Sequence, residues 1–183
     1  MVEAKLGNKL QSKLKKKIGV LGGTFDPAHK GHLAISSKAK KMFKLNYVIW
    51  AITKKNPFKN KSNLSLNQRI NFAKKITKKY KFIKVKFYEK KISSNRTIDL
   101  INHLRKKNNL TIYLIMGADN IVNFHKWNKW KLISQKSNIL VFDRQGYKTK
   151  CLKSITFKQL NQKNLEFIKF KKVNISSSQL RKI

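Results

Sequence analysis

Cysteine is nearly absent from this chain of 183 residues, whose single thiol is that of Cys151. One cysteine excludes an internal disulfide, and so few thiols are typical of a protein kept in a reducing compartment. Apolar runs are short as well, and none approaches the roughly 18 residues needed to cross a membrane. Residues 1–17 are basic but contain no apolar stretch of signal-peptide length. We therefore expect a cytoplasmic protein without a membrane partner.

Acidic residues and arginine are also scarce, although the chain is strongly basic. Its net charge is +37, and only five of its 44 basic residues are arginine. This charge would suit a nucleic-acid-binding protein, because phosphate backbones attract cations. Specific reading of bases, however, relies on arginine. Here lysine is spread along the chain with asparagine and isoleucine, a mixture that AT-rich codons produce. Two interpretations stay open: codon bias with weak binding to polyanions, or a nucleic-acid-binding protein.

The most informative stretch is the block of residues 18–33, IGVLGGTFDPAHKGHL. Its apolar first residues predict a buried strand. The pair Gly22 and Gly23 lets the chain turn sharply and leaves room for a ligand. Apolar residues at helical spacing predict a helix that begins near Lys30. The block therefore predicts a strand, a glycine turn and a helix.

Two histidines lie where that helix begins. His29 and His32 are three positions apart, a spacing that places side chains on the same side of a helix. The backbone N–H groups and the dipole at a helix N-terminus favour phosphate binding, and Gly31 leaves space for a nucleotide. The plainer interpretation is a pair of surface histidines near a turn. The adjoining GGTFDP sequence favours the phosphate site.

The rest of the chain alternates between predicted strands and helices. Strands are expected at 47–53, 82–87, 110–116, 138–142 and 165–173, and helices from near Ser65 and Thr97. The alternating pattern of 82–87 indicates an edge strand, and the apolar run 110–116 a central one. Residues 148–165 are lysine-rich and predict no element. We expect an α/β fold, a doubly wound Rossmann-like parallel sheet of five or six strands with helices on both faces.

One domain over residues 18–183, preceded by a basic extension of residues 1–17, suits the length of the chain. Within the domain, Asp119 follows the central strand directly after Gly117. A carboxylate there is placed to accept hydrogen bonds from ribose hydroxyls, unless it caps a helix. Trp127 and Trp130 have a spacing that suits either core packing or a platform for an aromatic ring.

The last ten residues, NISSSQLRKI, predict a second phosphate site. Ser176 and Gln179 have the spacing of a capping box, so a helix is expected to begin there with unpaired N–H groups. Arg181 adds positive charge from the next turn.

Several of these segments together resemble a known family. GGTFDPAHKGH resembles the signature of the nucleotidyltransferase superfamily that carries an H-x-G-H element. GADN with NFHKWNKW, RQGY and ISSSQLR are similar to segments of bacterial nicotinate-nucleotide adenylyltransferases. The resemblance implies an enzyme that transfers AMP from ATP to nicotinate mononucleotide. The products would be pyrophosphate and nicotinate adenine dinucleotide, the precursor of NAD.

In such a reaction, we expect His29 and His32 to stabilise charge in the transition state, with no covalent intermediate. No group of carboxylates and histidines is spaced as a metal cage, so Mg²⁺ would arrive with ATP. The expected partners are small-molecule substrates and no specific nucleic acid.

The residues expected to bind substrates fall into two sets. The ATP set is Gly22, His29, Gly31, His32, Lys59, Gly117, Asp119, Ile175, Ser176, Ser177 and Arg181. The mononucleotide set is Gly23, Thr24, Phe25, Thr97, Trp127 and Arg144. The resemblance alone assigns Lys59 to the triphosphate, Trp127 to stacking on the pyridine ring and Arg144 to the substrate's surroundings. A solvated basic loop and a salt-bridged surface arginine are the plainer interpretations of Lys59 and Arg144.

Two departures from the family pattern matter. SSNRTIDL keeps Thr97 and Asp99 of the family's S-Y-T-x-D-T-L, whose N–H groups hold the pyridine carboxylate, but has Arg96 where the family has tyrosine. A guanidinium beside a helix N-terminus still attracts a carboxylate, although nicotinamide mononucleotide stays open as the substrate. GADN and Trp127 argue against phosphopantetheine. The chain also ends two residues after Arg181, where relatives continue into a further helix.

Overall fold

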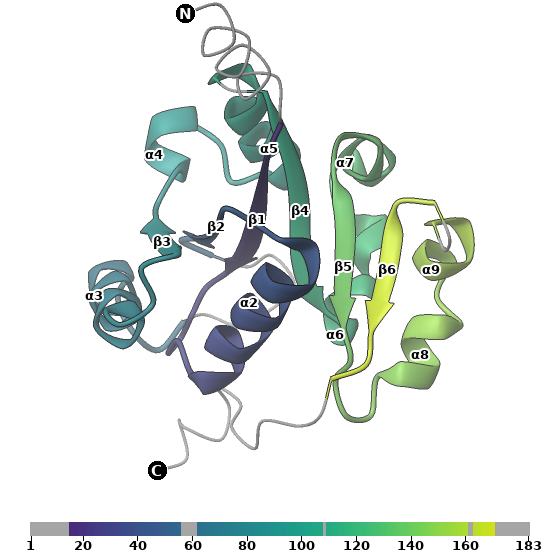
Figure 1. Ribbon diagram of the computed structural model, residues 1–183, viewed down its shortest axis with the longest axis horizontal. Helices are drawn as coiled ribbons and strands as arrows, with labels where there is room; N and C mark the ends of the chain where they lie inside the picture. Colours follow the sequence, from purple (N-terminus) through teal and green to yellow (C-terminus); the bar gives the residue numbers. More distant parts are fainter. Residues whose placement is uncertain (1–14, 56–61, 108, 161–162, 171–183) are drawn as a thin grey trace, which may run out of the picture.

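Six parallel strands form a single sheet in the order β3-β2-β1-β4-β5-β6 (Figure 1). The computed structural model describes residues 15–55, 62–107, 109–160 and 163–170. The strands are β1 Lys16–Gly23, β2 Tyr47–Ile52, β3 Ile83–Lys86, β4 Leu110–Gly117, β5 Asn138–Phe142 and β6 Leu165–Ile168. The expected doubly wound, Rossmann-like sheet is confirmed.

Helices cover both faces of this sheet. They are α2 Lys30–Phe43, α3 Leu66–Thr77, α4 Glu89–Ile92, α5 Thr97–Lys107, α6 Ala118–Ile121, the 3-10 turn η1 Phe124–Lys126, α7 Trp130–Lys136, α8 Lys148–Leu152 and α9 Ile155–Leu160. Buried residues of α2 and α3 share one core cluster, and those of α5 to α9 share the other. In the part of the chain that the structure describes, none of the helices is long and apolar enough to span a membrane.

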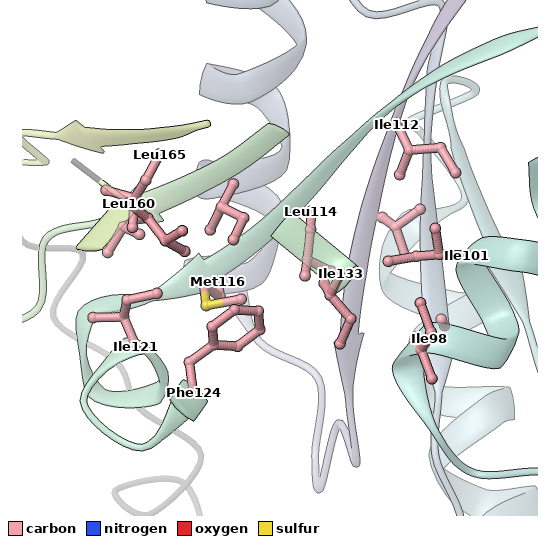
Figure 2. Packing of buried hydrophobic residues seen from close by; sticks show 14 of the residues in the cluster. Ile98, Ile101, Ile112, Leu114, Met116, Ile121, Phe124, Ile133, Leu160 and Leu165 are labelled. Atoms are coloured by element: carbon pink, nitrogen blue, oxygen red, sulfur yellow. The ribbon is translucent and has the colours of Figure 1, made fainter. Parts of the chain in front are cut away.

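The core on the α5 face explains why the sequence of the central strand β4 is almost entirely apolar. Ile98 and Ile101 of α5 lie beside Ile112 of β4, while Met116 at the end of β4 meets Phe124 (Figure 2). Because a central parallel strand is covered on both faces, successive residues are buried in opposite directions. Ile115 accordingly belongs to the core cluster on the α2 face.

The edge position of β3 follows from its alternating sequence. Ile83 is buried, whereas Lys84 and Lys86 are exposed, and β3 pairs with β2 alone among the described strands. Lysines on the solvent-exposed face of an edge strand interact with water and discourage pairing with other chains. The edge strand expected from residues 82–87 is therefore confirmed.

Besides shifts of other strand ends, such as β6 ending at Ile168 within the expected 165–173, three features of the fold differ from the sequence expectations. The first strand begins at Lys16, two residues before Ile18, because Lys16 pairs with Leu110. Residues 148–165 contain α8 and α9, which are anchored by the fully buried Cys151 and by Leu160. These helices are too short, and their exposed positions too rich in lysine, to produce a clear apolar period.

The third difference concerns which side of α2 is buried. Met42 is one of the apolar residues whose spacing predicts this helix and a buried side, yet it is 48% exposed, whereas Ser36 and Ala39 are fully buried. Small side chains let α2 lie close to the sheet. The indole N–H of Trp50 donates to Ser36 Oγ at 2.9 Å, which satisfies both polar groups inside the core.

A glycine in the middle of β1 also keeps α2 and the strands close. A Cβ atom on Gly19 would lie 2.9 Å from Ile115 Cδ1 and 3.1 Å from both Leu45 and Val48. All three neighbours are buried, so they have little room to move. At Gly22, near the end of the same strand, an added Cβ would meet nothing within 4 Å.

We expect Gly19→Ala to lower the free energy of unfolding by about 1–3 kcal/mol, because the core has no space for a methyl group. Gly22→Ala is the matched control and should change it by less than about 1 kcal/mol. Urea denaturation of both variants measures the difference. Equal stability of the two variants would contradict the packing described for Gly19.

Candidate active site

The candidate site lies at the carboxyl ends of three neighbouring strands. His29 follows β1, Asp119 follows β4 and Arg144 follows β5. Chain order reverses between β1 and β4, since β1 pairs with β2 on one side and β4 on the other. In open parallel sheets, ligands bind at such a switch point, outside the carboxyl ends of the strands.

Two imidazoles cap α2. His29 is the N-cap residue, and its Nδ1 accepts a hydrogen bond from the Gly31 N–H at 3.1 Å. In return, Nδ1 of His32 accepts one from the His29 N–H at 3.2 Å. This is a capping box in which histidines take the places usual for Ser or Thr and Glu. The ring centroids lie 3.9 Å apart, so both rings stand together at the helix start.

The capping bonds determine where each neutral imidazole carries its proton. Since Nδ1 of each ring accepts a backbone N–H, the neutral tautomer has its hydrogen on Nε2. An Nε2–H group is a donor suited to a phosphate oxygen. The helix start thus combines two imidazole donors with the positive end of the α2 dipole.

His32 rests on buried aromatic side chains. The Phe25 ring lies 4.8 Å from the His32 ring, and Trp50 meets His32 edge-on at 5.9 Å. Phe25 also stacks on Trp50 at 5.0 Å, and both are at most 2% exposed. Phe25 has a left-handed backbone with φ of 50°, which is unusual for a side chain of this size. A role for Phe25 in mononucleotide binding would therefore involve its backbone rather than its ring.

Burial keeps His29 neutral. Burial, and to a smaller extent the positive charge of Arg144, together lower the pKa of His29 from 6.5 to about 4. At neutral pH the ring is therefore uncharged, consistent with the acceptor role of its Nδ1. The influence of Arg144 also indicates that the residue following β5 reaches the site formed after β1.

Arg144 is paired with Asp119. Its guanidinium contacts Asp119 Oδ2 at 2.5 Å, in an ion pair whose arginine side chain is 46% exposed. The salt-bridged interpretation of Arg144 is thus observed, and its partner is itself a predicted site residue. The other carboxylate oxygen, Asp119 Oδ1, is buried and has no hydrogen-bond partner among the described residues. It is in a position to accept a hydrogen bond from a ligand.

Glycines leave space around these groups. Gly22 lies near the end of β1, and a Cβ atom added there would meet nothing within 4 Å. At Gly117, a Cβ would lie only 2.5 Å from Asp119 Oδ1. Any side chain at residue 117 would therefore displace the carboxylate. The Gly23 carbonyl accepts from Thr53 N–H at 2.9 Å, which ties the end of β1 to the end of β2.

The residues expected around the pyridine ring lie on the α5 face of the sheet. Thr97 begins α5, and Asp99 accepts a hydrogen bond from Ser94 Oγ at 2.7 Å, while Arg96 is exposed. Trp127 is half-buried after η1, where its ring tilts against Phe124 at 5.1 Å. Trp130 meets Phe124 edge-on at 6.2 Å, as expected of a packing residue.

The structure brings together four of the predicted site residues: His29, His32, Asp119 and Arg144. Five others, Lys59, Ile175, Ser176, Ser177 and Arg181, lie outside the described residues. Among the residues that are described, no group of three His, Cys, Asp or Glu side chains could hold a metal ion.

Sequence reasoning missed Asp26 and Arg69, both of which are buried close to the site loops. Arg69 donates hydrogen bonds to main-chain carbonyls on both the loop after β1 and the loop after β2. The signal that could have identified Arg69 is its residue type, because only five of the 44 basic residues are arginine and the rest are lysine.

We expect His29 to titrate in the folded protein with a pKa of about 4, against 6.5 in an unfolded chain. Because the folded value is the lower one, the unfolded chain takes up the proton first. The contribution of His29 to stability is therefore complete above pH 6.5 and is lost as the pH falls toward 4. An NMR titration of the histidine ring protons measures the pKa.

Arg144→Gln serves as the matched variant for this titration. The variant should raise the pKa of His29 only part of the way toward 6.5, because burial, the larger cause of the lowered value, remains. A midpoint near 6.5 in the wild type would contradict the buried, neutral imidazole.

Known proteins resemble this chain in sequence along most of its length. A family model described as cytidylyltransferase-like matches residues 20–183. A protein of Pelagibacter ubique, described as a probable nicotinate-nucleotide adenylyltransferase, is 66% identical over 176 residues, which cover 96% of this chain and 97% of that protein. A Clostridium tetani protein with the same description is 33% identical over 174 residues, covering 91% and 86%.

The fold also matches a solved structure, that of Plasmodium falciparum nicotinic acid mononucleotide adenylyltransferase complexed with NaAD. The TM-score is 0.72 at 21% identity, with 91% of this chain and 83% of that chain covered. At this identity the match concerns the fold alone. The membership in the family rests on the sequence matches, and the family model, from residue 20 onward, covers the glycine turn and the paired histidines. The chain belongs to the nicotinate-nucleotide adenylyltransferase family, within the cytidylyltransferase-like nucleotidyltransferases.

Proposed function

We propose that this protein transfers AMP from ATP to nicotinate mononucleotide and releases pyrophosphate. The observation that carries the proposal is the pair of capping imidazoles at the start of α2, next to the open end of β1. The relationship to the Pelagibacter ubique protein, 66% identical over 96% of this chain, supports the choice of substrates.

The reaction is a phosphoryl-type transfer that needs alignment and charge stabilisation. An oxygen of the mononucleotide phosphate attacks the α-phosphorus of ATP in line. One P–O bond forms while the bond to the β-phosphate breaks, and pyrophosphate leaves with the bonding electrons. The protein forms no covalent bond with either substrate. Its contribution is to hold the reacting groups in line and to donate hydrogen bonds to the phosphoryl oxygens.

The histidines supply those hydrogen bonds. Nε2–H of His29 and of His32 would donate to phosphate oxygens of ATP, together with the first N–H groups of α2. A bound triphosphate would raise the pKa of His29 from about 4, because the anion favours the protonated ring. The imidazole then carries more positive charge when the anion is present, which is when stabilisation is needed.

Other site residues would position the substrates. Asp119 would keep the ion pair between its Oδ2 and Arg144. Its Oδ1, which has no partner among the described residues, would accept a hydrogen bond from a ribose hydroxyl. Gly22, Gly23 and Thr24 would leave room for the mononucleotide phosphate, and Thr97 and Trp127 would hold the pyridine. Gly31 would leave space around ATP, and Gly117 would leave room for the Asp119 carboxylate beside it. The remaining residues proposed for ATP are Lys59, Ile175, Ser176, Ser177 and Arg181. Mg²⁺ enters this scheme as part of the MgATP substrate, and the expected location is cytoplasmic.

A second candidate function is binding to polyanions. An open groove of about 540 Å³ lies at the opposite end of the strands, beside the first residues of β4 and β5. Its lining includes Lys15, Arg105, Lys106 and Lys136. If nucleic acid binds there, retention on DNA should fall steeply with salt and should weaken in Arg105→Gln. The adenylyltransferase reaction should be unaffected by that change.

We expect His32→Ala to lose at least ~100-fold in turnover, about 3 kcal/mol of barrier, because one donor to the phosphoryl oxygens is removed. His103→Ala on α5 is the matched histidine control and should retain its turnover. Pyrophosphate release from ATP and nicotinate mononucleotide measures both, after thermal unfolding has established that each variant is folded. Equal turnover of wild type and His32→Ala would remove His32 from the mechanism.

Arg96 tests the choice between acid and amide substrates. We expect nicotinate mononucleotide to be preferred over nicotinamide mononucleotide in the wild type. Arg96→Ala should raise KM for the acid by roughly fivefold, the ~1 kcal/mol typical of an exposed charge pair, and leave KM for the amide unchanged. Steady-state kinetics with both mononucleotides measure this. A wild-type preference for the amide would overturn the substrate assignment.

A further inference from the structure

Arg69, on α3, is a buried arginine that no residue set described so far includes. It is 2% exposed, which is rare for arginine and requires compensation by hydrogen bonds and opposite charge. α3 contributes none of the proposed substrate-binding residues. The side chain nevertheless reaches from α3 to the loops at the carboxyl ends of β1 and β2.

The guanidinium of Arg69 donates to four main-chain carbonyls. Nη1 donates to Thr24 at 2.6 Å and to Thr53 at 2.8 Å. Nη2 donates to Lys54 at 3.1 Å, and Nε donates to Leu64 at 3.1 Å. These carbonyls belong to three separate segments: the loop after β1, the loop after β2 and the start of α3. One planar group therefore fixes the relative positions of all three.

Two carboxylates provide the compensating charge. Asp26, 6% exposed, accepts from the Asn63 and Leu64 N–H groups at 2.8 and 3.0 Å. Glu89, which begins α4, accepts from the Lys54 N–H at 3.1 Å. Burial lowers the pKa of Arg69, and the charges of Asp26 and Glu89 act in the opposite direction. We call these three residues the Arg69 cluster. It uses two of the seven acidic residues in a chain of charge +37.

The Arg69 cluster is connected to the histidines through five residues of chain. Thr24, bonded to Arg69, precedes Phe25, whose ring lies under His32 at 4.8 Å. Asp26 is held by the start of α3, and three residues later His29 caps α2. Segment 24–28 is thus attached at Thr24 and at Asp26. Its other end determines where both imidazoles stand.

We propose that Arg69 is a positioning residue for the transfer reaction: it holds segment 24–28 against the ends of β2 and α3, so that His29 and His32 face the phosphates in one fixed arrangement. The inference rests on the proposed function for its effect on turnover. Its structural part, the joining of three loops by one side chain, stands independently.

Arginine is required for this geometry because of its shape. The guanidinium presents five N–H donors in a rigid plane, whereas lysine offers a single rotatable ammonium with three. Arg69→Lys keeps the charge opposite Asp26 and Glu89 but loses the fork that spans Thr24, Thr53 and Lys54. The variant therefore separates the positioning of the loops from charge compensation.

The experiment has a kinetic arm and an arm that does not depend on activity. In the kinetic arm, Arg69→Lys should lose ~10- to 100-fold in kcat, because misplaced groups slow the transfer step, with smaller changes in KM. Arg105→Lys, on the exposed side of α5, controls for the chemical change. Leu110→Ala, in the core at the opposite end of β4, controls for lost stability. Both controls should keep kcat when assayed below their unfolding temperatures.

In the second arm, amide hydrogen exchange is followed in segments 22–29, 52–55 and 63–65. In the wild type these segments should open together, with one common dependence on denaturant, because they share one side chain. In Arg69→Lys they should exchange faster, while residues 138–142 of β5 are unchanged. The wild-type measurement needs no variant and remains decisive if Arg69→Lys fails to fold.

The outcomes separate the two proposals. Independent opening of the three segments in the wild type, or unchanged exchange in Arg69→Lys, would overturn the joining role of Arg69. Faster exchange with an unchanged kcat would overturn its role in positioning the histidines. A wild type that exchanges as expected but releases no pyrophosphate would overturn the proposed function and leave the joining role supported.

Discussion

The parallel pairing of β1 with both β2 and β4 is the constraint on which the rest of the structure depends. Residues 18–23 of β1 pair with β2, and residues 16–21 pair with β4. This central register places the ends of β1, β4 and β5 side by side, so that His29, Asp119 and Arg144 lie at one edge. It also brings the end of β2 next to the end of β1, where Arg69 joins them.

The site is built from electrostatic features that oppose the overall charge of the chain. In a protein of charge +37, the imidazole at the helix start is kept neutral by burial, and Arg144 is paired with one of the few carboxylates. Within the described residues, the site therefore offers an anionic ligand hydrogen-bond donors and a helix dipole rather than a dense group of fixed cations. Donors that are already oriented stabilise developing charge without reorganising during the reaction.

Much of the fold was predictable because its signals are local. The apolar runs of β2 and β4, the alternation in β3 and the Ser65–Gln68 capping box each depend on neighbouring residues, and the structure contains all of them. The helices α8 and α9 were not predictable, since their burial depends on which face of the sheet they cover. The burial of Ser36 was hidden for the same reason: its partner, Trp50, is on another element.

For the site, the sequence alone determined the strand, glycine turn and helix that bear His29 and His32, because glycine conformation, helix start signals and residue spacing act over a few residues. Only the tertiary structure decided that Asp119 pairs with Arg144 and that Arg69 donates hydrogen bonds to carbonyls of the loops after β1 and β2. These contacts join residues far apart in the chain. Strand order and packing select the partners in these contacts, and patterns among neighbouring residues do not predict either.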